Sequence, residues 1–287
     1  MDSKKKKKDD HEDQETTQEK SETTNGTATK GNGTKERVMP FLEHLEELRQ
    51  RLLKCILSIV FFTIGSYFIS KQLMKILVSP YPNKDEKLIF LAPTEGFMVH
   101  IKVALFAGII LSLPVIFYQL WKFVAPGLYK KEQKYVPIIV IFSTLSFLVG
   151  AVFCYFVIIP YGLNFLLNFN TEQFEASIQI KEYLKFVTLL ILVFGLIFEL
   201  PLLSYFLTKI GIVTPEFLKK NRRYGIVTIF IFAAVLTPPD VFTQVCLAGP
   251  LILLYEVSIW VSRMVTKKRD KEEEKSKADQ DDKNDKS

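Results

Sequence analysis

Long apolar stretches separated by short charged segments make up most of this chain. Residues 52–70 form a run of 19 in which Lys54 is the one charged side chain. At about 1.5 Å of rise per residue, a helix of that length crosses a hydrocarbon layer of about 30 Å. The same pattern predicts helices over 52–70, 99–120, 136–161, 183–207, 224–236 and 241–260. The sequence therefore predicts an all-α membrane protein with six transmembrane helices.

The fifth and sixth of these helices are expected to be short. The fifth has 13 residues, or about 20 Å, so it must use a thinned bilayer, lie partly below the surface, or share a short hairpin with the sixth across 237–240. We favour local thinning. Prolines interrupt the apolar runs, and each can kink a helix because it removes a backbone donor. These prolines are Pro114, Pro126, Pro137, Pro160, Pro201, Pro215 and Pro250. The sequence predicts a curved, kinked bundle with a concave face.

Both ends of the chain are dense in charge but balanced in sign. Residues 1–39 and 267–287 each hold equal numbers of basic and acidic side chains, so the net charge of +6 belongs to residues 40–266. Segments of this composition bury no core, and we expect both to be disordered cytoplasmic tails around a single transmembrane domain. Residues 1–39 also lack the apolar region of a signal peptide and are more acidic than a transit peptide.

Basic residues gather in alternate connections between the expected helices. Lysine and arginine near the ends of a span are retained in the cytoplasm. They precede the first helix, separate the second from the third and the fourth from the fifth, and follow the sixth. The clusters are Arg49, Arg51 and Lys54; Lys122, Lys130, Lys131 and Lys134; Lys209, Lys219, Lys220, Arg222 and Arg223; and Arg263, Lys267, Lys268 and Arg269. The other connections hold fewer in total, which places both termini in the cytoplasm.

The sequence offers little for catalysis or metal binding. Cys55, Cys154 and Cys246 fall in apolar stretches of different helices, which favours small buried hydrophobic side chains over a disulfide or a metal site. No metal-ligand spacing of Cys and His, glycine-rich phosphate loop or Ser/His/Asp arrangement is present. We therefore expect neither an enzyme with catalytic residues nor a metal or other cofactor.

A few polar groups lie inside the apolar runs. An ionised carboxylate at the centre of a bilayer costs about 2.5 to 3.5 kcal/mol to insert. Glu199 must therefore face a wet cavity, be protonated or meet a polar partner. We favour a functional role, because a Gln or Ser side chain could form a purely structural hydrogen bond at a lower cost of insertion. Glu256 lies nearer a helix end, where water or Arg263 can reach it, and a structural role is favoured. Gln244 fits a bond between helices as well as a functional role.

Carboxylates also accompany the basic clusters. Glu43, Glu46 and Glu47 precede Arg49, and Glu132 stands among lysines between the second and third helices. Charge runs usually form a solvated face. Carboxylates on a basic membrane surface are nevertheless well suited to a cationic peptide, because a guanidinium meets a carboxylate with two hydrogen bonds.

Four segments of the chain resemble the TatC family, the multispanning receptor component of the twin-arginine protein translocase. In order, they are HLEELRQRL, YQLWKFVAPGLYKKE, FGLIFELP and LTPPDVFTQ. The resemblance covers about residues 39–265 and neither tail. It implies a receptor without catalytic chemistry, in the plasma (inner) membrane of a prokaryote rather than in a thylakoid.

The resemblance also implies roles for individual residues. Signal peptides of folded cargo, with their paired arginines, are expected to bind at Glu47, Arg49, Glu132 and Phe123. Single-span partners of the TatA and TatB type are expected to dock at Glu199 and Gln244, and Asp240 is the acid of the family's outer turn. The complex is expected to be homo-oligomeric in this subunit, to lie in the lipid bilayer and to bind no nucleic acid.

A second interpretation is a secondary transporter for a small solute, with Glu199 as its proton or cation site. Transporters commonly carry internal structural repeats with interrupted helices at equivalent positions. The short fifth and sixth helices have no counterpart in the first half of this chain. The receptor interpretation is therefore favoured.

Overall fold

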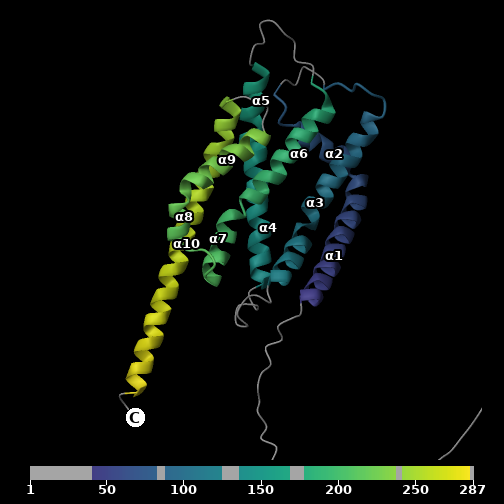
Figure 1. The fold of residues 1–287 in the computed structure, drawn as a ribbon. Coiled ribbons are helices and arrows are strands. Elements are labelled where there is room, and N and C mark those ends of the chain that lie inside the picture. Colours follow the sequence, from purple (N-terminus) through teal and green to yellow (C-terminus); the bar gives the residue numbers. More distant parts are fainter. Residues whose placement is uncertain (1–40, 83–87, 125–135, 169–177, 237–240, 285–287) are drawn as a thin grey trace, which may run out of the picture. The chain divides into compact units, whose positions relative to one another are not determined.

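A computed structural model describes residues 41–82, 88–124, 136–168, 178–236 and 241–284. Nearly all of them are helical (Figure 1). The helices are α1 (Phe41–Phe68), α2 (Ser70–Val78), α3 (Glu95–Val124), α4 (Val136–Phe153), the π-helix η3 (Cys154–Ile158), α5 (Ile159–Asn168), α6 (Ile180–Ile197), α7 (Leu200–Ile210), α8 (Pro215–Lys220), α9 (Arg222–Leu236) and α10 (Val241–Asn284). The prediction of an all-α protein is confirmed.

Five stretches in the described part of the chain are long and apolar enough to cross a membrane. They are His44–Phe68, Glu95–Val124, Val136–Leu167, Ile180–Ile210 and Gln244–Lys271. The expected fifth helix is present as α9, but it has 15 residues, about 22 Å of helix, which is shorter than a hydrocarbon layer of about 30 Å. By length and composition, five of the six predicted spans are therefore supported.

Two of the predicted proline interruptions change the helical structure locally. Pro160 follows the π-helix Cys154–Ile158 by two residues. A proline ring clashes with the carbonyl one turn earlier, and widening that turn relieves the clash. Pro201 lies at the start of α7, directly after the break between α6 and α7 at residues 198 and 199. Pro114 and Pro250 instead lie inside the continuous helices α3 and α10.

Close contacts at glycine residues set the packing between neighbouring helices. A Cβ atom on Gly108 of α3 would lie 2.7 Å from the backbone nitrogen of Thr63 in α1. Similarly, a Cβ on Gly150 of α4 would lie 2.7 Å from Cγ of Phe198. Since real Cβ contacts are longer than this, only glycine allows these helix axes to approach so closely.

Polar side chains join α7 to α10 deeper in the bundle. Ser204 donates its hydroxyl to the carbonyl of Ser258 at 2.9 Å, and the hydroxyls of Thr208 and Ser262 lie 2.6 Å apart. Each pair is one helical turn from the other, so that the same face of each helix provides both contacts. All four residues are buried. These bonds satisfy hydroxyl groups that would otherwise be isolated among apolar side chains.

Two connections meet at the end of the bundle where α3 and α6 begin, which is the upper end in Figure 1. Ile89 and Gln179 form an isolated parallel β-bridge. Glu95 accepts a hydrogen bond from the Leu91 backbone at 3.0 Å and another from the Gln179 side chain. This arrangement ties the start of α3 to the start of α6.

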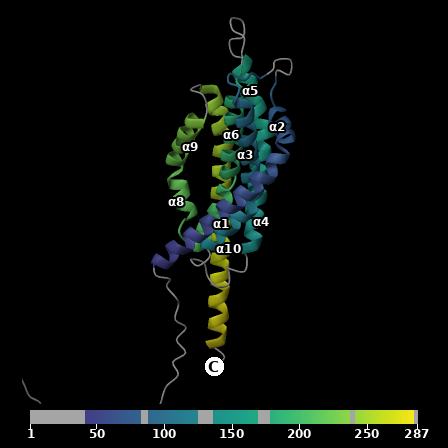
Figure 2. The same ribbon diagram turned by 90° about the vertical axis from the view of Figure 1, so that its right-hand side faces the viewer.

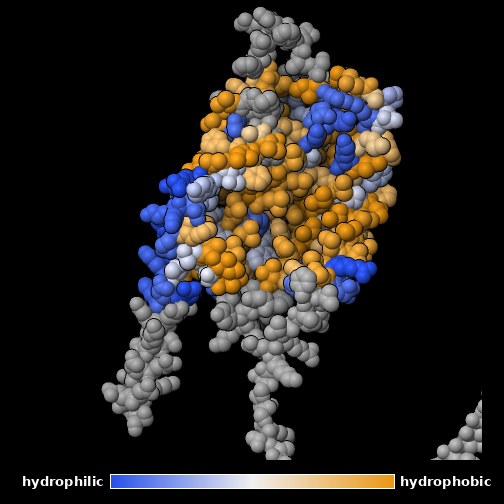
Figure 3. Space-filling model, in the orientation of Figure 1, coloured by the Kyte–Doolittle hydropathy of each residue, from blue (hydrophilic) through white to orange (hydrophobic). Residues whose placement is uncertain are grey.

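The outer surface of the bundle is largely apolar. In Figure 3, hydrophobic residues cover the middle of the visible face, while hydrophilic residues gather at its left edge beside α8, at the upper right and at the lower right near the start of α1. The apolar window of α1 is the least covered, with 6% of it buried against 33–39% for the other four spans. Such exposure is what lipid contact requires of a transmembrane helix.

The helix α10 extends beyond the predicted end of the last span. It continues to Asn284, whereas the sequence predicts a disordered tail from residue 267. The physical reason is that lysine, glutamate and alanine are strong helix formers. A segment without a core can therefore continue an existing helix, because the costly nucleation step has already been made.

The contact at Gly108 gives a testable prediction for the packing of α1 on α3. We expect Gly108→Ala to lower the free energy of unfolding by about 1 to 3 kcal/mol, because the added methyl group overpacks the contact with Thr63. Gly65→Ala is the matched control, since a Cβ there meets nothing within 4 Å. Thermal unfolding of both purified variants in detergent measures the difference, and equal stability would contradict the packing described here.

Candidate functional site

The first turns of α1 and the last turn of α3 meet at the lower end of the bundle in Figure 1. His44, Glu47 and Arg51 follow one another at spacings of three and four residues. That spacing places the three side chains on one face of α1. Phe123, in the last turn of α3, lies against the same face through its contact with His44.

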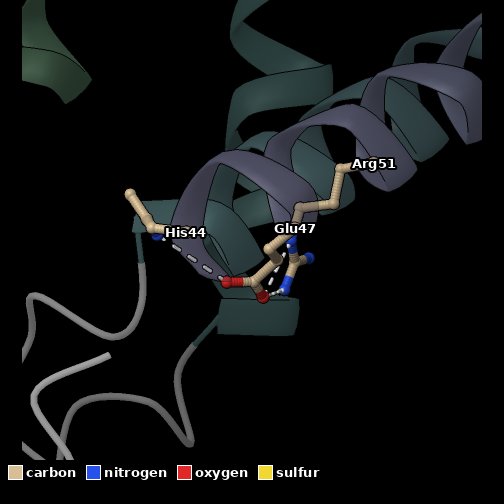
Figure 4. A network of polar contacts seen from close by, with 3 residues as sticks. All are labelled: His44, Glu47 and Arg51. Carbon is tan, nitrogen blue, oxygen red and sulfur yellow. Dashed lines mark hydrogen bonds and ion pairs between the residues drawn. The ribbon is translucent and has the colours of Figure 1, made fainter. Parts of the chain in front are cut away.

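Glu47 is the centre of a small charged network (Figure 4). Arg51 donates from Nε to Glu47 Oε1 at 3.1 Å, and its Nη2 approaches the same oxygen. His44 Nδ1 lies 3.8 Å from the other oxygen, Oε2. Oε2 is buried, and no hydrogen bond reaches it from the residues that the structure describes. One carboxylate oxygen is therefore bound internally and the other retains its capacity to accept.

The partly buried setting of Glu47 strengthens its interactions. The side chain is 24% exposed and that of Arg51 only 11% exposed. Charge-assisted hydrogen bonds in such a setting are less screened than those in open solvent. By contrast, Arg49 is 73% exposed and lies 3.7 Å from Glu46, which is 55% exposed. An exposed pair of this kind contributes little to stability.

His44 connects the charged network to α3. Its ring stacks on Phe123 with 4.3 Å between the ring centroids and 13° between the planes. The structure thus places Glu47 and Phe123 on either side of His44, whereas the side chain of Arg49 is exposed. Glu132 lies outside the described residues. His44 and Arg51 were not among the predicted site residues, although their spacing from Glu47 along the helix was the signal that could have found them.

Glu199 lies at the break between α6 and α7. It is 5% exposed, and the polar groups that act on its carboxyl are the Ser143 hydroxyl and the Phe147 backbone of α4. Ser143 in turn accepts a hydrogen bond from Trp121 Nε1 at 3.0 Å. Oε1 of Glu199 is buried without a hydrogen bond from the described residues. A polar partner inside the bundle, one of the environments considered for Glu199, is therefore present.

The other polar residues predicted inside spans hold helices together. Gln244 donates from Nε2 to the carbonyl of Phe230 at 3.1 Å and so links α10 to α9, which run side by side in Figures 1 and 2. Glu256 forms an ion pair with Arg222 at 2.5 Å rather than with Arg263. No contact in the described part of the chain joins Gln244 to Glu199. Asp240 lies outside the described residues.

The described residues contain no group of three or more His, Cys, Asp and Glu side chains that could hold a metal ion. None of the three cysteines forms a disulfide bond in the described part of the chain. Cys154 is buried as predicted, Cys55 is half-buried, and Cys246 is exposed. The prediction of burial is therefore wrong for Cys246, which lies on the outer face of a span where hydropathy alone does not separate lipid contact from core packing.

Comparison with known proteins places this geometry in context. Residues 43–250 match the family model described as Sec-independent protein translocase protein (TatC). Among similar proteins, the Sec-independent protein translocase protein TatC of Desulforapulum autotrophicum is 43% identical over 251 residues, which cover 86% of this chain and 93% of that protein. The protein of the same name from Helicobacter pylori is 44% identical over 222 residues, covering 77% and 87%.

A solved structure is similar as well. The crystal structure described as the twin arginine translocase receptor TatC superposes with a TM-score of 0.71 at 39% sequence identity. The match covers 78% of this chain and 100% of that one. The similarity therefore extends over the whole of the solved chain.

Proposed function

Because this chain belongs to the TatC family, we propose that it is the receptor and assembly core of a twin-arginine protein translocase. As a family member it is a multispanning component of a bacterial Sec-independent protein translocase, a transport protein that works in a complex with other Tat subunits. The proposal adds that it binds twin-arginine signal peptides of folded proteins and recruits single-span partners of the TatA and TatB type. Family membership gives no support to the solute-transporter alternative.

The observation that carries the signal-peptide proposal is the state of Glu47. Its Oε1 is bound by Arg51, while Oε2 accepts no hydrogen bond from the described residues. A guanidinium from a bound peptide could donate to this oxygen, beside the aromatic ring of Phe123. Arginine is preferred over lysine at such a site, because its planar group offers two parallel donors and stacks on aromatic rings. Glu132 is proposed as a second carboxylate for the arginine pair.

Support for partner docking comes from Glu199. Its buried oxygen Oε1 lacks a hydrogen bond from the described residues, and a polar group of a partner helix could supply one. Because the residue is 5% exposed, docking there requires α7 to separate locally from α4, and the helix break beside Glu199 is a natural hinge for that motion. Gln244 is proposed to contribute through the α9–α10 hairpin.

The proposal includes an orientation in the membrane. Both termini and the site around Glu47 face the cytoplasm, α9 forms a sixth, short span in a locally thinned bilayer, and the curved bundle presents a concave face to its partners. More than one copy of this subunit is expected in the complex.

Replacing Glu47 tests signal-peptide binding. We expect Glu47→Gln to weaken binding of an isolated twin-arginine signal peptide to the purified protein by about 1.5 kcal/mol, or about tenfold, because a charge-assisted hydrogen bond is lost. A peptide with a lysine pair should bind less tightly than one with arginines. Glu46→Gln is the matched control, since Glu46 is the neighbouring acid and is exposed. Equal affinity of the two variants would contradict the role of Glu47.

Replacing Glu199 tests partner docking. Crosslinking of a single-span partner to a cysteine placed on α7 should fall in Glu199→Ala and Glu199→Leu and fall less in Glu199→Gln, because the amide keeps hydrogen-bonding groups at that position. Signal-peptide affinity should not change in any of the three. If crosslinking is the same in all forms, Glu199 has only a structural role.

Cysteine labelling tests the orientation. In a cysteine-free background, a membrane-impermeant maleimide added to intact cells should label Lys71→Cys and Lys181→Cys, which lie in segments 71–97 and 164–182 on the proposed outer side. It should not label Lys209→Cys or Lys220→Cys until the cells are opened. Labelling of either of these last two in intact cells would refute the proposed orientation.

A further inference from the structure

His44 contacts two residues of the proposed peptide site, Glu47 and Phe123, although they belong to different helices. Its ring stacks on Phe123 of α3, and its Nδ1 faces Glu47 of α1. We infer that His44 is a positioning residue of this site, which holds Phe123 against α1 and controls access to the second carboxylate oxygen of Glu47. The inference rests on the proposed binding of signal peptides at Glu47.

The first step concerns the two oxygens of Glu47. Arg51 approaches Oε1 with two nitrogens and so occupies it. A further cation would therefore bind to Oε2. That atom is buried although the Glu47 side chain as a whole is 24% exposed. A ligand can reach it only if a neighbouring side chain moves.

The second step identifies His44 as a side chain that can make this movement. Its Nδ1 lies 3.8 Å from Oε2, too far for a hydrogen bond but near enough for an ion pair when the ring is protonated. The side chain is 40% exposed, so rotation toward solvent is not blocked by core packing. Arg51 is not free to move in the same way, because it is 11% exposed and held by Glu47.

The third step is the contact between His44 and α3. The nearly parallel stack places the imidazole ring of His44 against Phe123 and so joins the end of α3 to the first turns of α1. Phe123 is nine residues before Glu132 in the chain. The stack therefore holds the last turn of α3, from which the chain continues toward the second proposed carboxylate, beside the first turns of α1.

The charges around His44 determine how protonation acts on the site. Among the described residues, the charged groups near His44 on its own helix α1 are Glu46, Glu47, Arg49 and Arg51. In the last turn of α3, beside Phe123, the charged group is Lys122. Its Nζ lies 5.6 Å from the centre of the Tyr118 ring. Imidazole is the one side chain among these types that ordinarily changes charge near neutral pH. A protonated His44 is a cation facing Oε2, and it competes with an incoming guanidinium. A neutral His44 leaves that oxygen to the peptide.

The predicted consequence is a pH-dependent affinity. As pH falls, protonation of His44 should weaken binding of a twin-arginine signal peptide to the full-length protein in lipid nanodiscs. We expect a decrease of about two- to fivefold on protonation of the ring, the range of a partly exposed ion pair. His44→Phe keeps an aromatic ring to stack on Phe123 but has no titrating nitrogen. It should bind as tightly as the unchanged protein at pH 8 and lose the decrease at pH 6.

Two further variants separate the contributions. His44→Ala removes the ring as well, so it should bind more weakly than His44→Phe at both pH values. His100→Phe is the matched control, because His100 lies on α3 far along the helix from Phe123, and it should keep the normal pH profile. Thermal unfolding of each variant verifies that it is folded, and His44→Phe alone decides the pH effect if His44→Ala is unstable.

Specific outcomes overturn the inference. An unchanged pH profile in His44→Phe would exclude His44 as the group that controls Oε2, and equal binding by His44→Phe and His44→Ala would exclude a role for the stack. Failure of the underlying function is distinct, since Glu47→Gln would then bind peptide normally at pH 8. If Glu47→Gln weakens binding but His44→Phe retains the pH profile, only the role of His44 is refuted.

Discussion

Every backbone polar group that lies in hydrocarbon must find its hydrogen bond within the protein. Most of this structure depends on that constraint. It explains why the described residues are almost entirely helical and why the one β-bridge lies in the connections at an end of the bundle. It also explains the response to Pro160. A π-helical turn precedes this proline, because a widened turn keeps most backbone bonds while avoiding the proline ring.

Helix packing in such a bundle cannot rely on the hydrophobic effect, since lipid is as apolar as the side chains it would replace. Close approach and internal hydrogen bonds take over that role. Gly108 brings α3 against Thr63, and the Ser204 and Thr208 hydroxyls join α7 to α10. Large apolar residues are consequently free to cover the outside, as they do along α1.

The two carboxylates that matter most for the proposed function are held in different ways. Glu47 lies at an end of the bundle, where Arg51 compensates one oxygen and leaves the other available. Glu199 lies within a span, where Ser143 on α4 provides a polar neighbour. The first arrangement suits recognition of a soluble cationic segment. The second suits an interaction formed only when helices separate. We therefore propose two roles for the same residue type, set by access to water and by the local hydrogen-bond donors.

Four short motifs carried the resemblance to the family, and hydropathy alone determined the all-α class and the approximate positions of the long helices. It did so because an apolar run of fixed length has only one good solution in a bilayer. Helix ends were less predictable. The first helix begins at Phe41 rather than near residue 52, and the last one continues to Asn284, since charged residues with high helix propensity continue a helix that hydropathy does not detect.

Only the tertiary structure decided which charged side chains are buried and which residues of different helices meet. The sequence did not distinguish the burial of Glu47 from that of Arg49. The way α1 packs on α3 turns the side chain of Glu47 inward and leaves that of Arg49 exposed. The stack of His44 on Phe123 joins residues 79 positions apart in the chain, and the contact between Glu199 and Ser143 likewise crosses two helices. Such pairings depend on the angle and depth at which helices cross. Contacts such as that of Gly108 with Thr63 set that geometry, and no local pattern in the sequence specifies it.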